Sequence, residues 1–197
     1  MELIFATNNA HKLEEVQAII GDRFVVKSLA DIGCTDDIPE TGVTFEENAK
    51  QKTDYLVDRY GLDCFGDDSG LEIDALNKEP GVYSARYSGS RDMEKNIDLV
   101  LAKLGDNPNR TARFRTVISL FLNGQQYFFE GAIEGTIIRE RRGSGGFGYD
   151  PIFIPAGYGQ TFAEMTSEEK NKISHRAIAV GKLATFLKEN SPGQSVI

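Results

Sequence analysis

The fold is decided by residues 62–74, which read Leu-Asp-Cys-Phe-Gly-Asp-Asp-Ser-Gly-Leu-Glu-Ile-Asp. A short strand pattern runs into Asp67-Asp68-Ser69-Gly70, and an alternating pattern resumes with Leu71 and Ile73. Two adjacent carboxylates within a sheet repel each other and are costly to desolvate, so they are tolerated mainly beside a cation or within a hydrogen-bond network. Because Asp, Ser and Gly are common turn residues, the residues alone favour a tight acidic turn between two strands. A metal site becomes the better interpretation only if other parts of the chain supply matching partners.

The composition is that of an ordinary globular protein of 197 residues, with 40% hydrophobic and 26% charged residues. This length suits one domain, or one domain with two lobes around a cleft. The net charge of −8 disfavours nucleic-acid binding, which normally uses a basic face. Cys34 and Cys64 lack the spacing of a zinc site, and no signal peptide or membrane-span pattern is evident. We therefore expect a cytoplasmic protein with reduced thiols.

Strand and helix patterns alternate along the chain, which predicts an α/β fold. The Asn123-Gly124 pair predicts a hairpin turn, and Gly131 and Gly135 mark expected bulges in the strand that follows. Capping-box patterns at Thr44 and Thr166 predict where two helices begin. The predicted strands cover residues 2–6, 24–27, 112–122 and 127–138, and the predicted helices cover 11–20, 45–60 and 91–104, with a last helix after Ser174.

Two lysines are candidate anion ligands. Lys12 follows a strand and the loop Thr7-Asn8-Asn9-Ala10, a geometry that presents backbone N–H groups and polar side chains to phosphate. Most α/β proteins begin in this way, so the ordinary connection is the more frequent meaning. Lys52 falls on the apolar stripe of the helix 45–60, where a lysine either extends its head to solvent or reaches an anion. Extension to solvent is the commoner case.

The glycine-rich stretch 143–151 is the most unusual part of the chain. Its glycines allow another group to come close to the backbone, while Phe147 and Tyr149 offer stacking faces and Asp150 offers an acceptor. A flexible surface loop is the alternative, although the apolar residues 152–154 would anchor the stretch to the sheet. His175 and Arg176 fall in the first turn of the last helix, where cations oppose the helix dipole. That placement indicates an anionic or carbonyl ligand nearby.

Taken together, these stretches resemble the inosine triphosphate pyrophosphatase family, also called the Ham1-like or RdgB-like group. The resemblance covers nearly the whole chain, and the order and spacing of its motifs are highly specific. Asn8 departs from the glycine that often follows the first threonine in the family, but Asn tolerates a left-handed backbone. The matching segments are residues 6–12, Glu40-Thr41-Gly42, Phe45, residues 47–49, residues 67–71, residues 80–87, residues 145–151 and Ser174-His175-Arg176.

The resemblance implies a single domain, residues 1–197, with two lobes and a long mixed β-sheet flanked by helices around a cleft. It also implies a homodimer that hydrolyses ITP, dITP and XTP to the monophosphate and pyrophosphate with Mg²⁺. Glu40 and Asp68 would hold the metal, with Asp68 as the catalytic base and Asp67 as a further ligand or a support. The implied triphosphate-binding residues are Thr7, Asn8, Asn9, Ala10, His11, Lys12, Lys52, Ser69 and Lys170, and the implied base-binding residues are Phe147, Gly148, Tyr149, Asp150, His175 and Arg176.

Strand alternation would point Asp67 and Asp68 to opposite faces, so their division of roles stays open. Other pyrophosphatase classes fit less well: the Nudix cluster of glutamates is absent, the strand content argues against an all-helical MazG-type fold, and Maf-like proteins lack the Thr-x-Asn-x-x-Lys opening. A catalytically silent nucleotide-binding module is a further alternative. The presence of Glu40, Asp68 and the candidate lysines argues against it.

Overall fold

The computed structural model describes residues 2–22 and 24–190, with the side chain of His11 excepted. Most predicted elements are present within about two residues of their expected ends. The elements are β1 Glu2–Phe5, α1 Ala10–Ile20, β2 Val25–Lys27, α2 Phe45–Tyr60, β3 Cys64–Ile73, α3 Met93–Leu104, β4 Thr111–Leu122, β5 Gln125–Ile137, β6 Phe153–Pro155, α4 Ser167–Ile173 and α5 His175–Asn190.

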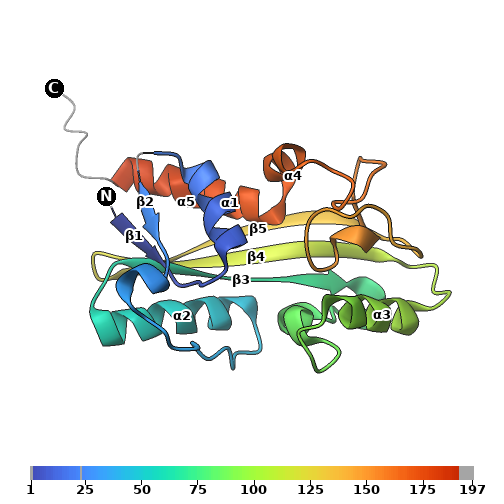
Figure 1. Cartoon of the computed structure of the whole chain (residues 1–197), viewed down its shortest axis with the longest axis horizontal. Helices are drawn as coiled ribbons and strands as arrows, with labels where there is room; N and C mark the ends of the chain where they lie inside the picture. The colour runs from blue at the N-terminus through green and yellow to red at the C-terminus, as the bar shows by residue number, and fades with distance from the viewer. Residues whose placement is uncertain (1, 23, 191–197) are drawn as a thin grey trace.

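The strands form a mixed sheet in the order β2-β1-β3-β4-β5-β6. β1 pairs in parallel with β2 and β3, whereas β3, β4, β5 and β6 pair antiparallel. Figure 1 shows α1 and α5 on one side of the long strands and α2 on the other. The predicted α/β fold, a long mixed sheet flanked by helices, is confirmed.

The helix ends follow local capping chemistry. The side chain of Thr44 accepts a hydrogen bond from the backbone N–H of Glu47 at the start of α2, and Gly61 ends this helix with a left-handed backbone (φ 63°). Thr166 and Glu169 form a complete capping box at the start of α4. These contacts explain why both helices begin where the sequence predicts.

The acidic turn favoured by the residues alone is wrong, because β3 runs without interruption from Cys64 to Ile73. Asp67, Asp68 and Ser69 pair in register with Ile118, Val117 and Thr116 of β4. Glycine is needed at position 70 because the backbone of another segment lies close to it, and not because the chain turns there. A Cβ at this position would lie 2.4 Å from the carbonyl oxygen of Gly81. Close packing of a distant loop, which residue types alone do not reveal, accounts for the glycine.

The bulges expected at Gly131 and Gly135 are also absent, since both residues pair one-to-one with Thr116 and Ala112. Like Gly70, both glycines allow another segment to pack closely against the strand. A Cβ on Gly131 would lie 2.1 Å from the carbonyl oxygen of His175, at the start of α5. One on Gly135 would lie 2.4 Å from the Ile154 oxygen in β6. Both glycines therefore let neighbouring backbone lie against β5.

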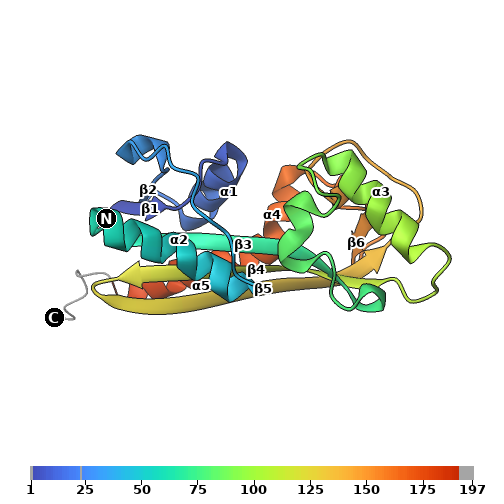
Figure 2. The ribbon, with the colours of Figure 1, turned by 90° about the horizontal axis from the view of Figure 1, so that it is seen from below.

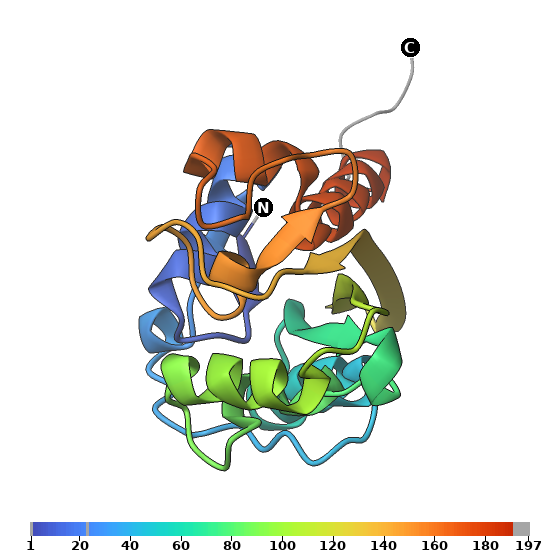
Figure 3. The ribbon, with the colours of Figure 1, turned by 90° about the vertical axis from the view of Figure 1, so that its right-hand side faces the viewer.

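Two apolar cores lie at opposite ends of the long strands. One contains Phe65, Leu120 and Leu183, and the other contains Leu71 and Ile97 together with residues of β4, β5 and β6. Figure 2 shows β1, β2 and α1 over one end and α3 and β6 over the other, and Figure 3 shows α3 and α5 on different sides of the strands. The long strands thus join two lobes.

Within residues 2–22 and 24–190, no helix combines the length and the apolar composition that a membrane span requires.

We propose that residues 1–197 unfold as one unit, because β3 and β4 each supply side chains to both cores. Leu120→Ala in one core and Leu71→Ala in the other should each lower the free energy of unfolding by about 2–5 kcal/mol, the usual cost of removing a buried leucine. Each variant should keep a single transition when urea unfolding is followed by far-UV circular dichroism and by tyrosine fluorescence. Two separate transitions, each moved by only one of the variants, would contradict a single unit.

Candidate functional site

A cleft of about 810 Å³ lies between the two lobes. From one lobe it is lined by the loop after β1, by the segment before α2 and by Lys52. From the other lobe it is lined by the 3-10 helix Gly81–Arg86, the start of α3 and residues 148–149. The predicted site residues that line it are Thr7, Asn8, Asn9, Lys12, Glu40, Lys52, Gly148 and Tyr149.

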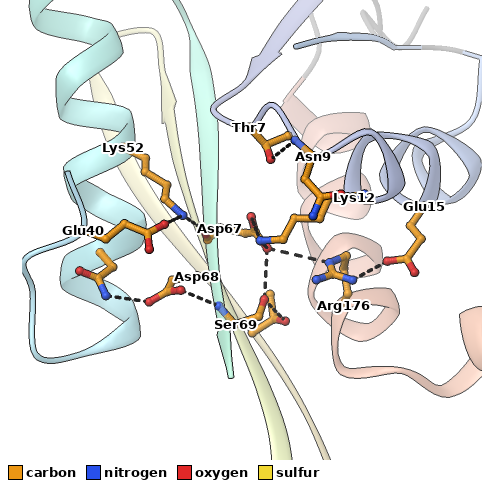
Figure 4. A network of polar contacts seen from close by, with 12 residues as sticks. Thr7, Asn9, Lys12, Glu15, Glu40, Lys52, Asp67, Asp68, Ser69 and Arg176 are labelled. Carbon is orange, nitrogen blue, oxygen red and sulfur yellow. Dashed lines mark hydrogen bonds and ion pairs between the residues drawn. The ribbon is translucent and has the colours of Figure 1, made fainter. Parts of the chain in front are cut away.

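The two central aspartates point to opposite sides of β3, as strand alternation predicts (Figure 4). Asp67 faces α1 and α5, where it contacts Lys12 and Arg176. Asp68 faces α2, where it accepts a hydrogen bond from Asn48. The carboxylates therefore have separate environments although they are adjacent in the chain.

Asp67 is held by fixed cations. Its two carboxylate oxygens each lie 2.9 Å from Nζ of Lys12, and Oδ2 also accepts a hydrogen bond of 3.1 Å from the hydroxyl of Ser69. Nε of Arg176 lies 3.9 Å from the same oxygen. Burial alone would raise the pKa of Asp67, but Lys12, Arg176 and Lys52 outweigh it and hold the pKa well below its usual range. Asp67 is therefore a permanently charged partner of these side chains.

Asp68 has mainly neutral donors. Oδ2 accepts from the amide of Asn48 at 2.8 Å, and Oδ1 accepts from the backbone N–H of Ser69 at 2.9 Å. Burial raises the pKa of Asp68 to about 6, and the charges of Glu40 and Asp67 add to this effect against the opposing influence of Lys52 and Asn48. A carboxylate with such a pKa takes up and releases protons near neutral pH.

Glu40 and Lys52 form the link between Asp68 and the cleft. Lys52 is 8% exposed, so the expected inward orientation is confirmed and extension to solvent is excluded. Its Nζ donates to the backbone carbonyl of Asp67 at 2.7 Å and pairs with the carboxylate of Glu40. Although burial opposes its charge, Asp67, Glu40 and Asp68 raise the pKa of Lys52. Lys52 is thus a charged group buried beside three carboxylates.

The predicted metal ligands do not form a ready cluster. Among the described residues, no group of three or more His, Cys, Asp or Glu side chains converges in a way that could hold a metal ion. Glu40 and Asp68 lie on the α2 side of β3, whereas the side chain of Asp67 lies on the other side. Any metal held here would bind to few carboxylates and complete its shell with other oxygens.

The loop before α1 is shaped by its own side chains. The hydroxyl of Thr7 accepts from the backbone N–H of Asn9 at 3.1 Å, and the Asn9 side chain accepts from the N–H of Lys12 at 3.3 Å, which caps α1. Asn8 lines the cleft and Ala10 is the first residue of the helix. The side chain of His11 lies outside the described part of the structure. The predicted phosphate loop therefore opens into the cleft at a helix N-terminus.

A second cavity of about 420 Å³ is lined by Phe147, Phe162 and Lys170 on one side and by α1 on the other. Lys170 donates to Oδ2 of Asp150 at 2.7 Å, and its Nζ lies 4.6 Å from the centre of the Phe147 ring. The structure thus groups Lys170 with the predicted base-binding residues instead of with Lys12 and Lys52. Burial raises the pKa of Asp150 against the opposing effect of Lys170.

The residues beside Phe147 are placed differently. Tyr149 is 4% exposed, and its hydroxyl donates to the backbone carbonyl of Ser84 at 2.8 Å. The backbone N–H of Gly148 points to the sulfur of Met93 at 2.9 Å. Phe147 is 37% exposed, so part of its side chain is accessible to a ligand. These contacts tie the glycine-rich stretch to the cleft wall, so the flexible-loop alternative is not supported.

The first turn of α5 is buried. The ring of His175 stacks on Phe114 at 4.9 Å between centroids, and among the described residues its Nδ1 has no hydrogen-bond partner. Burial, with Arg176 and Lys170 nearby, lowers the pKa of His175 well below its usual value. The expectation that His175 is a cation is therefore wrong, because its imidazole is neutral. Arg176 carries the charge, pairs with Glu15 and lies 5.6 Å from the ring of Phe147.

Three residues of this network were missed by the sequence analysis. Asn48 donates to Asp68, Glu15 pairs with Arg176, and Arg86 lies beside Glu40. Glu15 follows Lys12 by three residues, a spacing that places both on one face of α1. Asn48 and Arg86 fall inside segments that carry the family resemblance. Their roles depend on contacts between distant segments, which spacing along the chain does not reveal.

Comparisons with known proteins agree with the fold. The family model described as Ham1 family matches residues 3–186. A protein of Porphyromonas gingivalis named dITP/XTP pyrophosphatase is 53% identical over 188 residues, which cover 94% of this chain and 97% of the relative. A protein of Bacillus subtilis with the same name is 48% identical over 192 residues, covering 95% and 97%.

A solved structure of the Staphylococcus aureus Ham1 protein superposes with a TM-score of 0.90 at 38% identity, covering 97% of this chain and 100% of that one. A Ham1 protein from Coxiella burnetii gives a TM-score of 0.89 at 40% identity, covering 96% and 99%. Family model, curated relatives and solved structures agree over almost the whole chain. The chain belongs to the Ham1 family.

Proposed function

We propose that this chain is a nucleoside-triphosphate pyrophosphatase that hydrolyses ITP, dITP and XTP to the monophosphate and pyrophosphate. The observation that supports it most is the arrangement at β3, where a carboxylate with a pKa of about 6, Asp68, lies beside Glu40 and Lys52 at a cleft lined with cations. The relatives named dITP/XTP pyrophosphatase, about half identical over nearly their full length, point to the same substrates.

In the proposed reaction a water oxygen bonds to the α-phosphorus while the bond to the bridging oxygen breaks and pyrophosphate leaves. Asp68 accepts the proton of the attacking water, because its raised pKa matches a base that works near neutral pH. Lys52 and Lys12, with the backbone N–H groups before α1, counter the charge that gathers on the phosphate oxygens. Asp67 holds Lys12 in place, so we assign it a supporting role.

The residues present fit Mg²⁺. Glu40 and Asp68 provide hard carboxylate oxygens, and the hydrogen bonds that Asp68 accepts from Asn48 and Ser69 come from neutral donors, so its charge is left for a cation. Mg²⁺ is usually held by one or two carboxylates together with water and substrate phosphates, so the absence of a three-residue cluster among the described residues suits it. When bound, the ion would neutralise charge on the phosphates and lower the pKa of bound water.

For the base, Phe147 provides a stacking face, and the buried pair Asp150–Lys170 provides an acceptor and a donor. Asp150 suits the N1–H of a 6-keto purine. We assign Lys170, which lines the cavity beside Phe147, to the base instead of to the triphosphate, and we keep the neutral His175 as a further base-binding candidate. Adenine has the reversed pattern at N1 and C6, and each unpaired buried group costs about 1–3 kcal/mol.

We further propose that the protein acts as a cytoplasmic homodimer, as the family resemblance implies. The net charge of −8 and the cations around the cleft favour a small anionic substrate over nucleic acid.

Purified protein with Mg²⁺ should release pyrophosphate from ITP, dITP and XTP and should act far less on ATP. The reason is the donor–acceptor pattern at Asp150 and Lys170, which adenine cannot match. The measurement is product analysis by phosphorus NMR together with kcat/KM for each nucleotide. Orthophosphate as the first product would contradict attack at the α-phosphorus, and equal use of ATP would contradict the base assignment.

Asp68→Asn should lower kcat by about 10²–10⁴-fold, the usual contribution of a positioned general base. Folding should be preserved, because the folded-state pKa of Asp68 lies above its unfolded value and its charge therefore costs stability at pH 7. The free energy of unfolding of the variant should equal or exceed that of the wild type in urea. Near-normal turnover of Asp68→Asn would exclude Asp68 as the base.

The imidazole of His175 should stay neutral between pH 8 and pH 5, because its pKa lies well below the usual value. Nitrogen-15 NMR of the histidine side chains checks this, with His11→Gln as the variant that assigns the two sets of signals. The two ring nitrogens of His175 should keep different shifts, one protonated and one not, across the whole range. Titration with a midpoint near 6.5 would show that burial and the neighbouring cations do not control this group.

A further inference from the structure

We propose that Arg86 binds the pyrophosphate half of the substrate, and that it does so from the lobe opposite Lys12 and Lys52. This inference rests on the proposed function and adds a residue to it. Arg86 ends the 3-10 helix Gly81–Arg86 and lines the 810 Å³ cleft together with Lys12, Lys52 and Glu40. The argument depends on how firmly this helix is held, on what Arg86 contacts and on where the base-binding candidates lie.

The 3-10 helix that carries Arg86 is locked onto β3. The hydroxyl of Ser84 accepts from the backbone N–H of Leu71 at 2.9 Å and donates to the carbonyl of Gly81 at 2.6 Å. Gly70 leaves the space for this contact, because a Cβ there would lie 2.4 Å from the Gly81 oxygen. Through β3, the 3-10 helix is therefore fixed relative to Asp67 and Asp68, which lie on the same strand.

Two further contacts hold the same helix from within its own lobe. The hydroxyl of Tyr149 donates to the carbonyl of Ser84 at 2.8 Å, and the side chain of Asn96 donates to the carbonyl of Ala85 at 3.3 Å. Both contacts bind backbone carbonyls directly before Arg86 and so restrict the direction of its side chain. A support of this kind is expected for a group that must meet a ligand at a defined position.

Arg86 occupies the cleft beside Glu40. Its Nη1 lies 3.8 Å from Oε2 of Glu40, its Nη2 donates to the Glu40 backbone carbonyl at 3.4 Å, and its Cζ lies 5.5 Å from the ring centre of Tyr83. Neither contact with Glu40 is short, and the side chain is 36% exposed. The guanidinium therefore points into the cleft, and several of its N–H donors can bind a ligand there.

A structural clamp between lobes is the competing explanation. Ion pairs at this exposure and distance contribute little to stability. A guanidinium is always charged, and its fork of N–H donors matches phosphate oxygens, so an arginine at this place is better suited to an anion. Glu40 is itself a proposed metal ligand. When Glu40 binds a metal, Arg86 would exchange this carboxylate for a phosphate of the substrate.

The position of Arg86 selects the pyrophosphate half. Phe147 and Lys170, the candidates for the base, line the other cavity between α1 and α4. Arg86 is not part of that lining and instead lines the 810 Å³ cleft together with Glu40 and Lys52. A substrate with its base at Phe147 and its α-phosphate at Asp68 therefore extends its β- and γ-phosphates toward Arg86.

The test compares Arg86→Gln and Arg86→Lys with the wild type. Arg113→Gln is the matched control, because Arg113 is 35% exposed, pairs with Glu134 and does not line the cleft. Isothermal titration calorimetry in Mg²⁺ measures binding of three probes: inorganic pyrophosphate, inosine monophosphate and α,β-methylene-ITP. Thermal unfolding of each variant is recorded alongside, and kinetics with ITP give KM and kcat separately.

Arg86→Gln should weaken pyrophosphate and α,β-methylene-ITP by about tenfold or more, as expected when a charged donor to phosphate is lost, and should leave inosine monophosphate within about twofold. Arg86→Lys should lie between wild type and Arg86→Gln, and Arg113→Gln should match the wild type. The KM for ITP should rise with the loss of affinity. Melting temperatures should stay within a few degrees, since an exposed pair contributes little.

Unchanged pyrophosphate binding in Arg86→Gln overturns the proposal, as does equal weakening of inosine monophosphate. A large fall in melting temperature with unchanged affinity for all three probes would identify Arg86 as a clamp. Failure of the proposed function has a different signature. The wild type would release no pyrophosphate from ITP or XTP, yet Arg86→Gln would still lose pyrophosphate binding. That result would support the anion site at Arg86 and contradict the proposed activity.

Discussion

Burial of two adjacent negative charges, Asp67 and Asp68, in the middle of β3 is the constraint on which the rest of the site depends. The strand is covered on both faces, so both carboxylates are buried, and alternation sends them to different sides. Each side must therefore provide its own compensation. Helices α1 and α5 bring Lys12 and Arg176 to one face, and α2 brings Asn48 and Lys52 to the other.

The two compensations differ in kind, and the difference separates the roles of the aspartates. Asp67 has close cationic partners and is charged at every pH the protein meets, so it can only position other groups. Asp68 has neutral hydrogen-bond donors and a pKa of about 6, so it keeps the capacity to take a proton or to attract a metal. Adjacent residues of the same type thus acquire opposite chemistry through the strand's two-residue period.

Local signals predicted much of the fold, and contacts between distant segments explain what they missed. The ends of α2 follow from Thr44 and Gly61 and the hairpin from Asn123-Gly124, because these effects act within a few residues. Gly70 and Gly131 were misread as turn and bulge residues, since the backbone that lies against them comes from far along the chain. The same division holds for the site. Helix periodicity predicted the inward position of Lys52. The Lys170–Asp150 and Arg176–Glu15 pairs could be found only from the tertiary structure.

The distribution of ion pairs also indicates where an anion can enter. Lys12 cannot easily leave Asp67, because that carboxylate is only 3% exposed and would lose its partner inside the protein. Glu40 is 32% exposed and holds both Lys52 and Arg86 at the cleft. Releasing Arg86 costs less, since it and Glu40 are each about a third exposed and water, a metal ion or a ligand can take over either partner. Positive charge for a polyphosphate therefore becomes available on the Glu40 side of β3, while the Asp67 side stays fixed and holds the loop before α1 in position.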